Sequence, residues 1–262
     1  MVNGNMKKLY DKNELAFALL WIGLYVLSMN IALRFCGGFD DLADKTVPQL
    51  LVPVVCILLL AVLAGAWVSK HKLGEKYGLC PFKGNLKVFL YFIPLILMSC
   101  INLINGLALP APLAVSLLMM LNLALAGYVE EVIFRGFLFR ALLKDGLKSA
   151  VIISAVTFGI GHIVNLANTA DRVGTILQVC YAVAVGFMYT LIALKGGSIW
   201  PCIISHMFVN GSSVFALEHG GFTRLCAKIT GSTSPLLADF FSALLIILVS
   251  GGYALWLWKK AE

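Results

Sequence analysis

Two adjacent carboxylates and a guanidinium interrupt a long apolar stretch at Glu130, Glu131 and Arg135. An Asp, Lys or Arg at the centre of a membrane helix costs roughly 2.5–3.5 kcal/mol on insertion scales, so such a cluster indicates a functional role. Glu131 and Arg135 are four residues apart, share one helical face and are expected to form an ion pair. Glu130 is rotated by about 100° from Glu131, so we expect it to face a cavity as the reactive carboxylate.

Histidine stands in two other apolar stretches. His162 ends the segment 158–162, and His206 precedes Asn210 by four residues, so these two side chains share a helical face. Together with Glu130 they would activate a water and stabilise an oxyanion, which peptide-bond hydrolysis requires. In this scheme Glu130 is the general base, His162 helps to hold the water, and His206 and Asn210 donate to the oxyanion.

A metal ion offers a second scheme with the same residues. Glu130, His162 and His206 would supply three ligands and leave a position open, as in catalytic zinc centres. The sequence contains no HExxH motif and no two histidines four residues apart, so no local pattern indicates Zn²⁺. If the site holds a metal, we expect zinc. Both the metal-free scheme and the zinc scheme stay open.

Composition indicates a membrane protein. Hydrophobic residues make up 60% of the 262 residues and charged residues only 13%, whereas about 25% is usual in soluble domains. The seven cysteines show no paired spacing and are expected to be small buried hydrophobes. We find no internal repeat or soluble domain, so residues 1–262 are predicted to form a single integral-membrane domain.

Spans of about 20 apolar residues are needed to cross a bilayer, and eight stretches meet that length. They predict an all-α, polytopic bundle of about eight transmembrane helices. The predicted spans are roughly 14–36, 47–69, 86–107, 112–143, 147–168, 172–194, 197–217 and 236–258.

Loop charges give the expected orientation. Most Lys and Arg residues lie in the N-terminus, in the second, fourth and sixth loops and in the C-terminus, whereas the first loop is acidic. The positive-inside rule then places both termini in the cytoplasm of a multi-pass protein of the cell membrane. Because orientation and lipid headgroups explain the net charge of +7, the lipid bilayer is the expected partner and no nucleic acid is expected.

Depth in the membrane provides a further check on the polar residues. At about 1.5 Å per residue, Glu130, His162, His206 and Asn210 lie on the order of 14–23 Å from the cytoplasmic ends of their spans. The fourth, fifth and seventh spans are therefore expected to bring these four side chains into one layer.

Three motifs on successive apolar segments carry a resemblance: EExxxR at 130–135, FxxxH at 158–162 and HxxxN at 206–210. Together they resemble the CPBP intramembrane protease family. That family includes the type II CAAX prenyl proteases and the bacteriocin-processing or immunity proteins, and is also called Abi. The similarity covers about residues 115–215, which would be the catalytic core, and the family's eight-helix α-fold agrees with the predicted spans.

The resemblance also implies roles for the residues. Glu130 and His162 would activate the nucleophilic water, while His206 and Asn210 would stabilise the tetrahedral oxyanion. Members of the family have been described both as metalloproteases and as metal-independent glutamate proteases, so either type is open here.

Glu131 and Arg135 would hold the site together, according to the same resemblance. The expected function is that of an intramembrane endopeptidase, with a peptide or a membrane-associated protein as substrate. The alternative is a non-catalytic bacteriocin-immunity or scaffold membrane protein that keeps the motifs for structure. A proton-relaying transporter is less favoured because no repeated halves or paired broken helices are visible.

Overall fold

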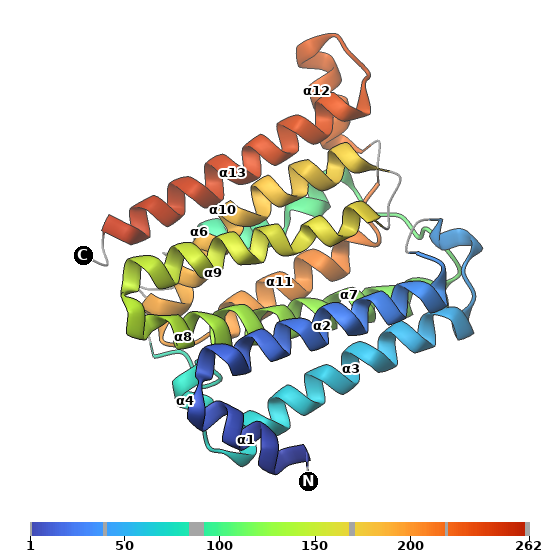
Figure 1. The fold of residues 1–262 in the computed structure, drawn as a ribbon. Coiled ribbons are helices and arrows are strands. Elements are labelled where there is room, and N and C mark those ends of the chain that lie inside the picture. Colours follow the sequence, from blue (N-terminus) through green and yellow to red (C-terminus); the bar gives the residue numbers. More distant parts are fainter. Residues whose placement is uncertain (1, 39–40, 84–91, 168–170, 218–219, 260–262) are drawn as a thin grey trace.

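The computed structural model describes residues 2–38, 41–83, 92–167, 171–217 and 220–259. Within these ranges the regular elements are helices, apart from one isolated β-bridge between Leu107 and Ala216. The long helices pack into a bundle, and α2 begins at the same end of it at which α13 finishes (Figure 1). The all-α bundle predicted from the sequence is confirmed.

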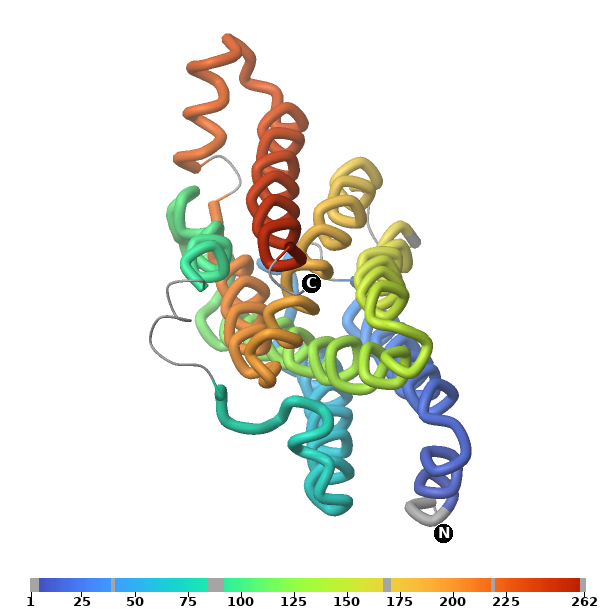
Figure 2. Tube along the Cα trace, turned by 90° about the vertical axis from the view of Figure 1, so that its left-hand side faces the viewer, coloured from blue at the N-terminus to red at the C-terminus, as the bar shows by residue number. Residues whose placement is uncertain are grey.

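Six helices in the described part of the chain are long and apolar enough to cross a membrane. They are α2 (Glu14–Cys36), α3 (Val47–Lys70), a continuous stretch Leu113–Asp145, a stretch Leu147–Leu166, α10 (Arg172–Gly196) and α13 (Pro235–Lys259). The remaining helices are short or amphipathic. They include α1 (Val2–Lys12), α4 (Gly74–Tyr77), α8 (Phe139–Leu142) and α12 (Gly221–Thr230), of which α12 stands apart from the main bundle (Figure 2).

The predicted count of eight spans is not confirmed, because two of them are not long helices. In the third, residues 86–91 lie outside the described residues, and the rest forms α6 (Ile93–Ser99) and the 3₁₀ segment η2 (Ile101–Asn105). At this break the Asn102 amide donates to the Val209 carbonyl (2.7 Å) and to Ser212 (2.9 Å) of α11.

The seventh predicted span contains α11 (Trp200–Ser213), which has 14 residues. Helix α10 ends at Gly196 and is followed by the cap residue Gly197, whose φ of 63° lies in the left-handed region that favours glycine, and Pro201 then stands in the first turn of α11. At its other end the chain turns back to pair with residues 106–108. The glycine and proline before α11 and the turn after it therefore make this helix shorter than the apolar stretch predicted from hydropathy.

The fourth span changes helix type at the residues of interest. Helix α7 (Leu113–Glu131) continues as a π-helical segment, η3 (Val132–Leu138), before α8. All seven residues of η3 are buried. Since π-helical turns widen a helix and often occur at functional sites, this segment positions the polar cluster.

Helices α7 and α11 approach each other closely at Gly127. A Cβ atom on this residue would lie 3.1 Å from backbone atoms of His206 and Met207. A second close approach joins α10 to α9 (Leu147–Gly161), where a Cβ on Gly159 would lie 2.8 Å from the Val183 nitrogen. Gly127 thus lets two motif-bearing helices meet at backbone distance, and Gly159 does the same for α9 and α10.

An aromatic layer fills the bundle from η3 toward the end that carries the termini. It consists of Phe17, Trp21, Trp67, Tyr77 and Phe137, each less than 5% exposed. Phe137 makes edge-on contacts with Phe17 (5.3 Å between ring centroids) and with Tyr77 (4.9 Å). Such packing leaves little room for water, so this aromatic layer closes the bundle on that side.

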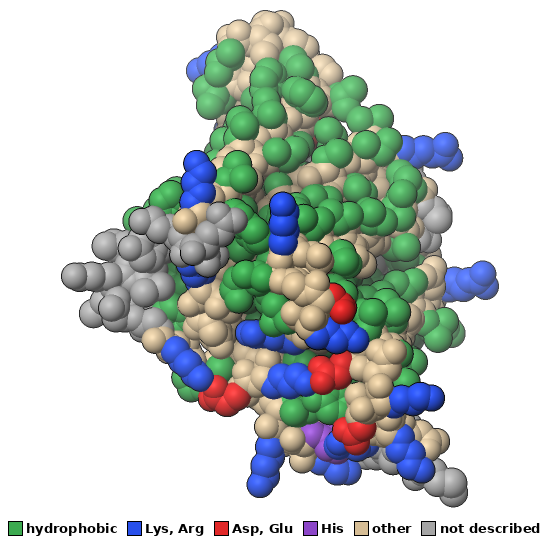
Figure 3. Space-filling model, turned by 60° about the vertical axis from the view of Figure 1, so that its left-hand side comes forward, with side chains coloured by type: hydrophobic (Ala, Val, Ile, Leu, Met, Phe, Trp, Pro, Cys, Tyr) green, Lys and Arg blue, Asp and Glu red, His purple; other side chains and the backbone are tan. Residues whose placement is uncertain are grey.

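Basic side chains gather at the same end of the molecule. Figure 3 turns this end forward and shows Lys and Arg side chains over the lower part of the face, with fewer Asp and Glu among them. They follow α1, the segment around α4, and the connection from α8 to α9. The described basic residues in these places are Lys7, Lys8, Lys12, Lys70, Lys72, Lys76, Lys83, Arg140, Lys144 and Lys148.

Candidate active site

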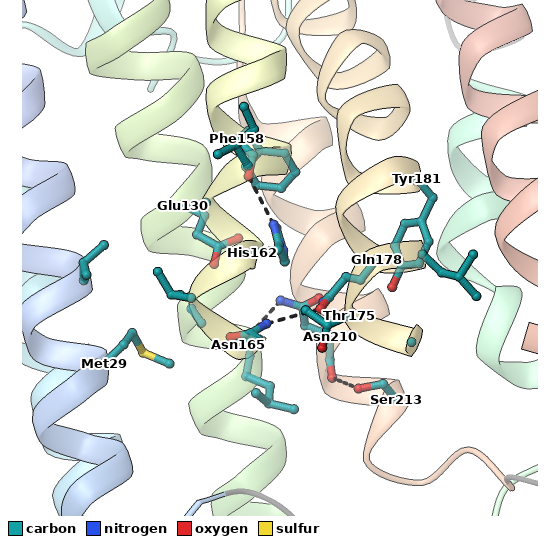
Figure 4. Close-up of a pocket in the computed structure, with 18 of the residues that line it drawn as sticks. Met29, Glu130, Phe158, His162, Asn165, Thr175, Gln178, Tyr181, Asn210 and Ser213 are labelled. Carbon is teal, nitrogen blue, oxygen red and sulfur yellow. Dashed lines mark hydrogen bonds between the residues drawn. The ribbon is translucent and has the colours of Figure 1, made fainter. Parts of the chain in front are cut away.

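A cavity of about 810 Å³ lies inside the bundle, beside the end of α7. Helices α2, α7, α9, α10, α11 and α13 all line it, as does the 3₁₀ segment η5 (His162–Ala167). Its polar lining includes Tyr25, Glu130, His162, Asn165, Gln178 and Asn210. Figure 4 shows several of these side chains gathered around one space.

Glu130 lines this cavity, as the helical spacing predicts. Its Oε1 accepts a hydrogen bond from the Tyr25 hydroxyl, and its Oε2 lies 3.5 Å from Nε2 of His206. The carboxylate also points toward His162 across the cavity (Figure 4). With a side chain 12% exposed, Glu130 is held in place from two sides and still reachable from the cavity.

Glu131 and Arg135 form the predicted ion pair, with 3.0 Å between Nη1 and Oε1. Both side chains are fully buried. The guanidinium also lies over the Phe158 ring, 4.1 Å from its centroid, and 5.4 Å from that of Tyr189. Aromatic faces on a buried guanidinium offset part of its desolvation cost, so this pair forms a closed ionic core.

His206 joins this core and not the cavity wall. Its Nδ1 lies 2.8 Å from Oε1 of Glu131, and the residue is 7% exposed. Its neighbour Asn210 lines the cavity and donates to the Leu123 carbonyl (3.3 Å). His206 and Asn210 lie on the same side of α11, but the His206 imidazole lies between the carboxylates of Glu130 and Glu131.

His162 stands at the junction of α9 and η5. Its Nδ1 lies 3.1 Å from the Phe158 carbonyl, one helical turn back. A carbonyl oxygen only accepts, so Nδ1 carries the hydrogen, and Nε2 of the neutral ring is left as an acceptor toward the cavity. The FxxxH spacing therefore fixes the tautomer of His162 as well as its position.

Tyr25 is a site residue that sequence reasoning missed. It comes from α2, a helix 105 residues away from Glu130 in the chain, and the only sequence signal was a hydroxyl within an apolar span. Asn165 and Gln178 were also not assigned to the site. They line the cavity and are joined by a hydrogen bond of 3.2 Å between the two amides.

A metal site would need several His, Cys, Asp or Glu side chains close together in the part of the chain that the structure describes. Among them, no three His, Cys, Asp or Glu residues are arranged to hold a metal ion. Glu130 and His206 come together, and Nδ1 of His206 and of His162 is bonded to Glu131 and to a carbonyl respectively, contacts that leave Nε2 of each ring as the remaining nitrogen. Zinc bound through Glu130, His162 and His206 therefore stays a prediction.

Comparison with known protein families gives one result. Residues 112–212 match the family described as Rce1-like, type II CAAX prenyl endopeptidase Rce1-like. This range contains all three motifs and agrees with the 115–215 expected from the sequence, so the resemblance is confirmed there. A search of curated proteins finds no match. In general terms, the family match and the apolar helices indicate a multi-pass membrane protein and an endopeptidase with a peptide substrate.

Proposed function

We propose that this Rce1-like membrane protein hydrolyses a peptide bond inside the bundle, with Glu130 as the base that activates water. The observation that carries the proposal is the position of the Glu130 carboxylate. It lines a cavity large enough for a peptide segment, and it is oriented by Tyr25 on one side and His206 on the other. A general base must be held within reach of its water in this way.

His162 is the second group that acts on the water. Because its Nδ1 hydrogen is committed to a carbonyl, its Nε2 accepts a hydrogen bond from a water placed between the ring and Glu130. Two acceptors then orient one water, Glu130 takes its proton, and the oxygen attacks the scissile carbonyl. Glu130 can return that proton to the leaving amine.

The charges around His206 suit it to the oxyanion. Its Nδ1 donates to Glu131, so Nε2 donates only when the ring carries both hydrogens. Arg135 balances one of the two carboxylates, and an imidazolium would balance the other. A doubly protonated His206 and the second amide hydrogen of Asn210 would then stabilise the negative oxygen of the tetrahedral intermediate.

This mechanism is that of a glutamate-type endopeptidase, and no step in it passes through a metal. If the protein binds zinc, Glu130, His162 and His206 are the candidate ligands, and the ion would polarise the carbonyl or activate the water. Metal content measured on the purified protein, beside a Glu130→Gln variant, tests that possibility separately from activity.

Orientation in the membrane is part of the proposal. Both termini lie at the basic end of the bundle, so the positive-inside rule places them in the cytoplasm. Glu130 is then within the bilayer, on the far side of the aromatic layer from the cytoplasm.

Cleavage by purified protein tests the proposed function. Two quenched fluorescent probes, a farnesylated CAAX peptide and an unmodified apolar peptide, are compared in detergent. Glu130→Gln and His162→Ala should each reduce cleavage by about 100-fold or more, because each removes one of the groups that act on the water. Glu75→Gln is the matched control, since Glu75 is exposed and pairs with Lys83 away from the cavity.

Unchanged cleavage in Glu130→Gln protein would refute the mechanism. If no variant and no unsubstituted protein cleaves either probe, while Glu130→Gln leaves the cellular phenotype intact, the non-catalytic immunity or scaffold role replaces it.

A further inference from the structure

Helix α12 projects from the bundle beside the start of α13, at the far end of that helix from the C-terminus (Figures 1 and 2). Both of its ends are fixed. At its start the backbone N–H of Phe222 donates to Oδ1 of Asn105 in η2 (3.1 Å). At its end Gly231 adopts a left-handed φ of 70° before the chain turns into α13. The neighbouring segments therefore hold α12 at the edge of the bundle.

One face of α12 is apolar. Phe222, Leu225, Cys226 and Ile229 are three or four residues apart and form the stripe that is typical of an amphipathic helix. Cys226 is buried, but Leu225 is 51% and Ile229 is 75% exposed. The described part of the protein therefore leaves much of this apolar stripe uncovered.

The apolar surface continues from α12 onto α13. A groove of about 270 Å³ lies between the two helices, and its lining is apolar except for the Cys226 thiol and the Thr230 hydroxyl. On the α13 side the lining includes Leu244 and Leu248, which are 38% and 64% exposed. Because α13 is long and apolar enough to cross a membrane, this groove lies against the bilayer, where acyl chains can fill it.

The opposite face of α12 is basic. Arg224 and Lys228 are four residues apart, both are exposed, and α12 contains no Asp or Glu. Among the residues that the structure describes, neither side chain belongs to an ion pair. Basic residues concentrate at the other end of the bundle (Figure 3), so the positive-inside rule does not account for these two. Their charges are available to an anion from outside the protein.

An apolar and a basic face on opposite sides of one short helix are typical of a helix that lies in the membrane interface. The apolar stripe then contacts acyl chains, and the long Arg and Lys side chains reach the lipid headgroups. A headgroup with a net negative charge attracts both side chains, whereas a zwitterionic headgroup has no net charge to offer them. The pattern of α12 therefore favours an anionic lipid over a neutral one.

We propose that α12 binds an anionic phospholipid at the membrane interface. Arg224 and Lys228 hold the phosphate of its headgroup, and the groove between α12 and α13 takes an acyl chain. The lipid is a bound partner of the protein and not a substrate, so the proposal does not depend on peptide hydrolysis.

Lipid titration of the purified, delipidated protein in an uncharged detergent tests the headgroup contact. Microscale thermophoresis compares palmitoyl-oleoyl phosphatidylglycerol with phosphatidylcholine that has the same acyl chains. Arg224→Gln and Lys228→Gln should each weaken phosphatidylglycerol binding about fivefold and leave phosphatidylcholine binding unchanged. A double variant, Arg34→Gln with Lys148→Gln, is the control, because it removes two exposed charges from α2 and α9 and should change neither affinity.

Leu248→Trp tests the groove in the same titration. The larger ring fills space that the acyl chain would take, so phosphatidylglycerol binding should weaken about tenfold, the equivalent of roughly two methylene groups left unburied. Leu255→Trp is the matched control, since Leu255 of α13 is similarly exposed (67%) and does not line the groove. Circular dichroism checks that both variants keep their helices.

Equal affinity of the unsubstituted protein for the two lipids would overturn the proposal, as would an equal loss of phosphatidylglycerol binding in the double control variant. A dimer that Leu248→Trp dissociates would overturn it too, because the groove would then hold a second copy of the chain.

Salt decides the question with the unsubstituted protein if a variant fails to fold. Added salt should weaken phosphatidylglycerol binding, because it screens the headgroup contacts, and should leave phosphatidylcholine binding unchanged. Phosphatidylglycerol binding that does not respond to salt would overturn the proposal. None of these measurements uses peptide cleavage, so their outcome is separate from that of the proposed function.

Discussion

Glu130 has a closed side, where a buried ionic cluster lies, and an open side, where the cavity lies. The residues on the two sides differ in their burial and in their hydrogen-bond partners. On the closed side, Glu131, Arg135 and His206 bind one another at 2.8–3.0 Å, with Glu131 and Arg135 fully buried. On the open side, His162 and Asn210 face an 810 Å³ cavity and bond mainly to backbone carbonyls. The first group pairs its charges internally, whereas the second keeps hydrogen-bonding capacity toward the cavity.

This difference explains why the adjacent residues Glu130 and Glu131 can have different roles. A carboxylate enclosed with a guanidinium and an imidazole contributes to folding, and removing one partner leaves a buried charge unpaired. A carboxylate that a hydroxyl and an imidazole hold beside a cavity is available for chemistry. The substitutions below test whether the two sides are separable, beginning with the largest expected effect.

Arg135→Ala should break the closed side. It leaves Glu131 buried with only His206 as a partner, which is expected to cost about 3–5 kcal/mol of unfolding free energy. Thermal unfolding followed in detergent would measure it, with Lys144→Ala as the exposed control. Equal destabilisation by Arg135→Ala and by Glu130→Gln would contradict the separation of the two sides.

Gly127→Ala should loosen the contact between α7 and α11, the helices that carry residues of both sides. The added Cβ would lie 3.1 Å from the backbone of His206 and Met207, so α7 and α11 must move apart, at a cost of about 1–3 kcal/mol. The Glu131–Arg135 pair lies within one helical stretch and should survive, while the contacts of His206 with both glutamates lengthen. Stability and cleavage should therefore fall together.

Gly251→Ala is the matched control for that change, because a Cβ at Gly251 in α13 meets nothing within 4 Å. If Gly127→Ala behaves like Gly251→Ala, the close approach of the two helices is not what positions His206.

Tyr25→Phe should weaken only the open side. It removes the hydroxyl that donates to Glu130 and keeps the ring, so kcat is expected to fall about tenfold, with less than about 1 kcal/mol lost in stability. A purely structural role would leave the pH profile of kcat unchanged, whereas a positioning role shifts it. Tyr181→Phe is the control, since Tyr181 lines the same cavity without a hydrogen bond to Glu130 among the described contacts.

Much of the candidate site followed from helical spacing. The i,i+4 relation of Glu131 and Arg135 fixes their pairing in any helix, and the rotation between neighbouring residues separates Glu130 from Glu131. The FxxxH spacing likewise brings the His162 ring to the Phe158 carbonyl. These relations hold over a few ångströms of one helix, which is why the sequence could predict the first two.

Contacts between helices were not predictable in the same way. Tyr25 reaches Glu130 from a helix 105 residues away, and His206 turns toward Glu131 from a distance of 75 residues. The break of the third predicted span at Asn102 also depends on acceptors in α11. Each of these depends on how close two helices lie, and hydropathy does not contain that information.

Composition and the 3.6-residue period were enough to predict that the chain forms membrane helices and which polar residues share a helical face. The fold added the contacts between helices, such as those of Tyr25 with Glu130 and of His206 with Glu131. It also decided on which side of the site the cavity lies, because side-chain burial depends on how neighbouring helices pack.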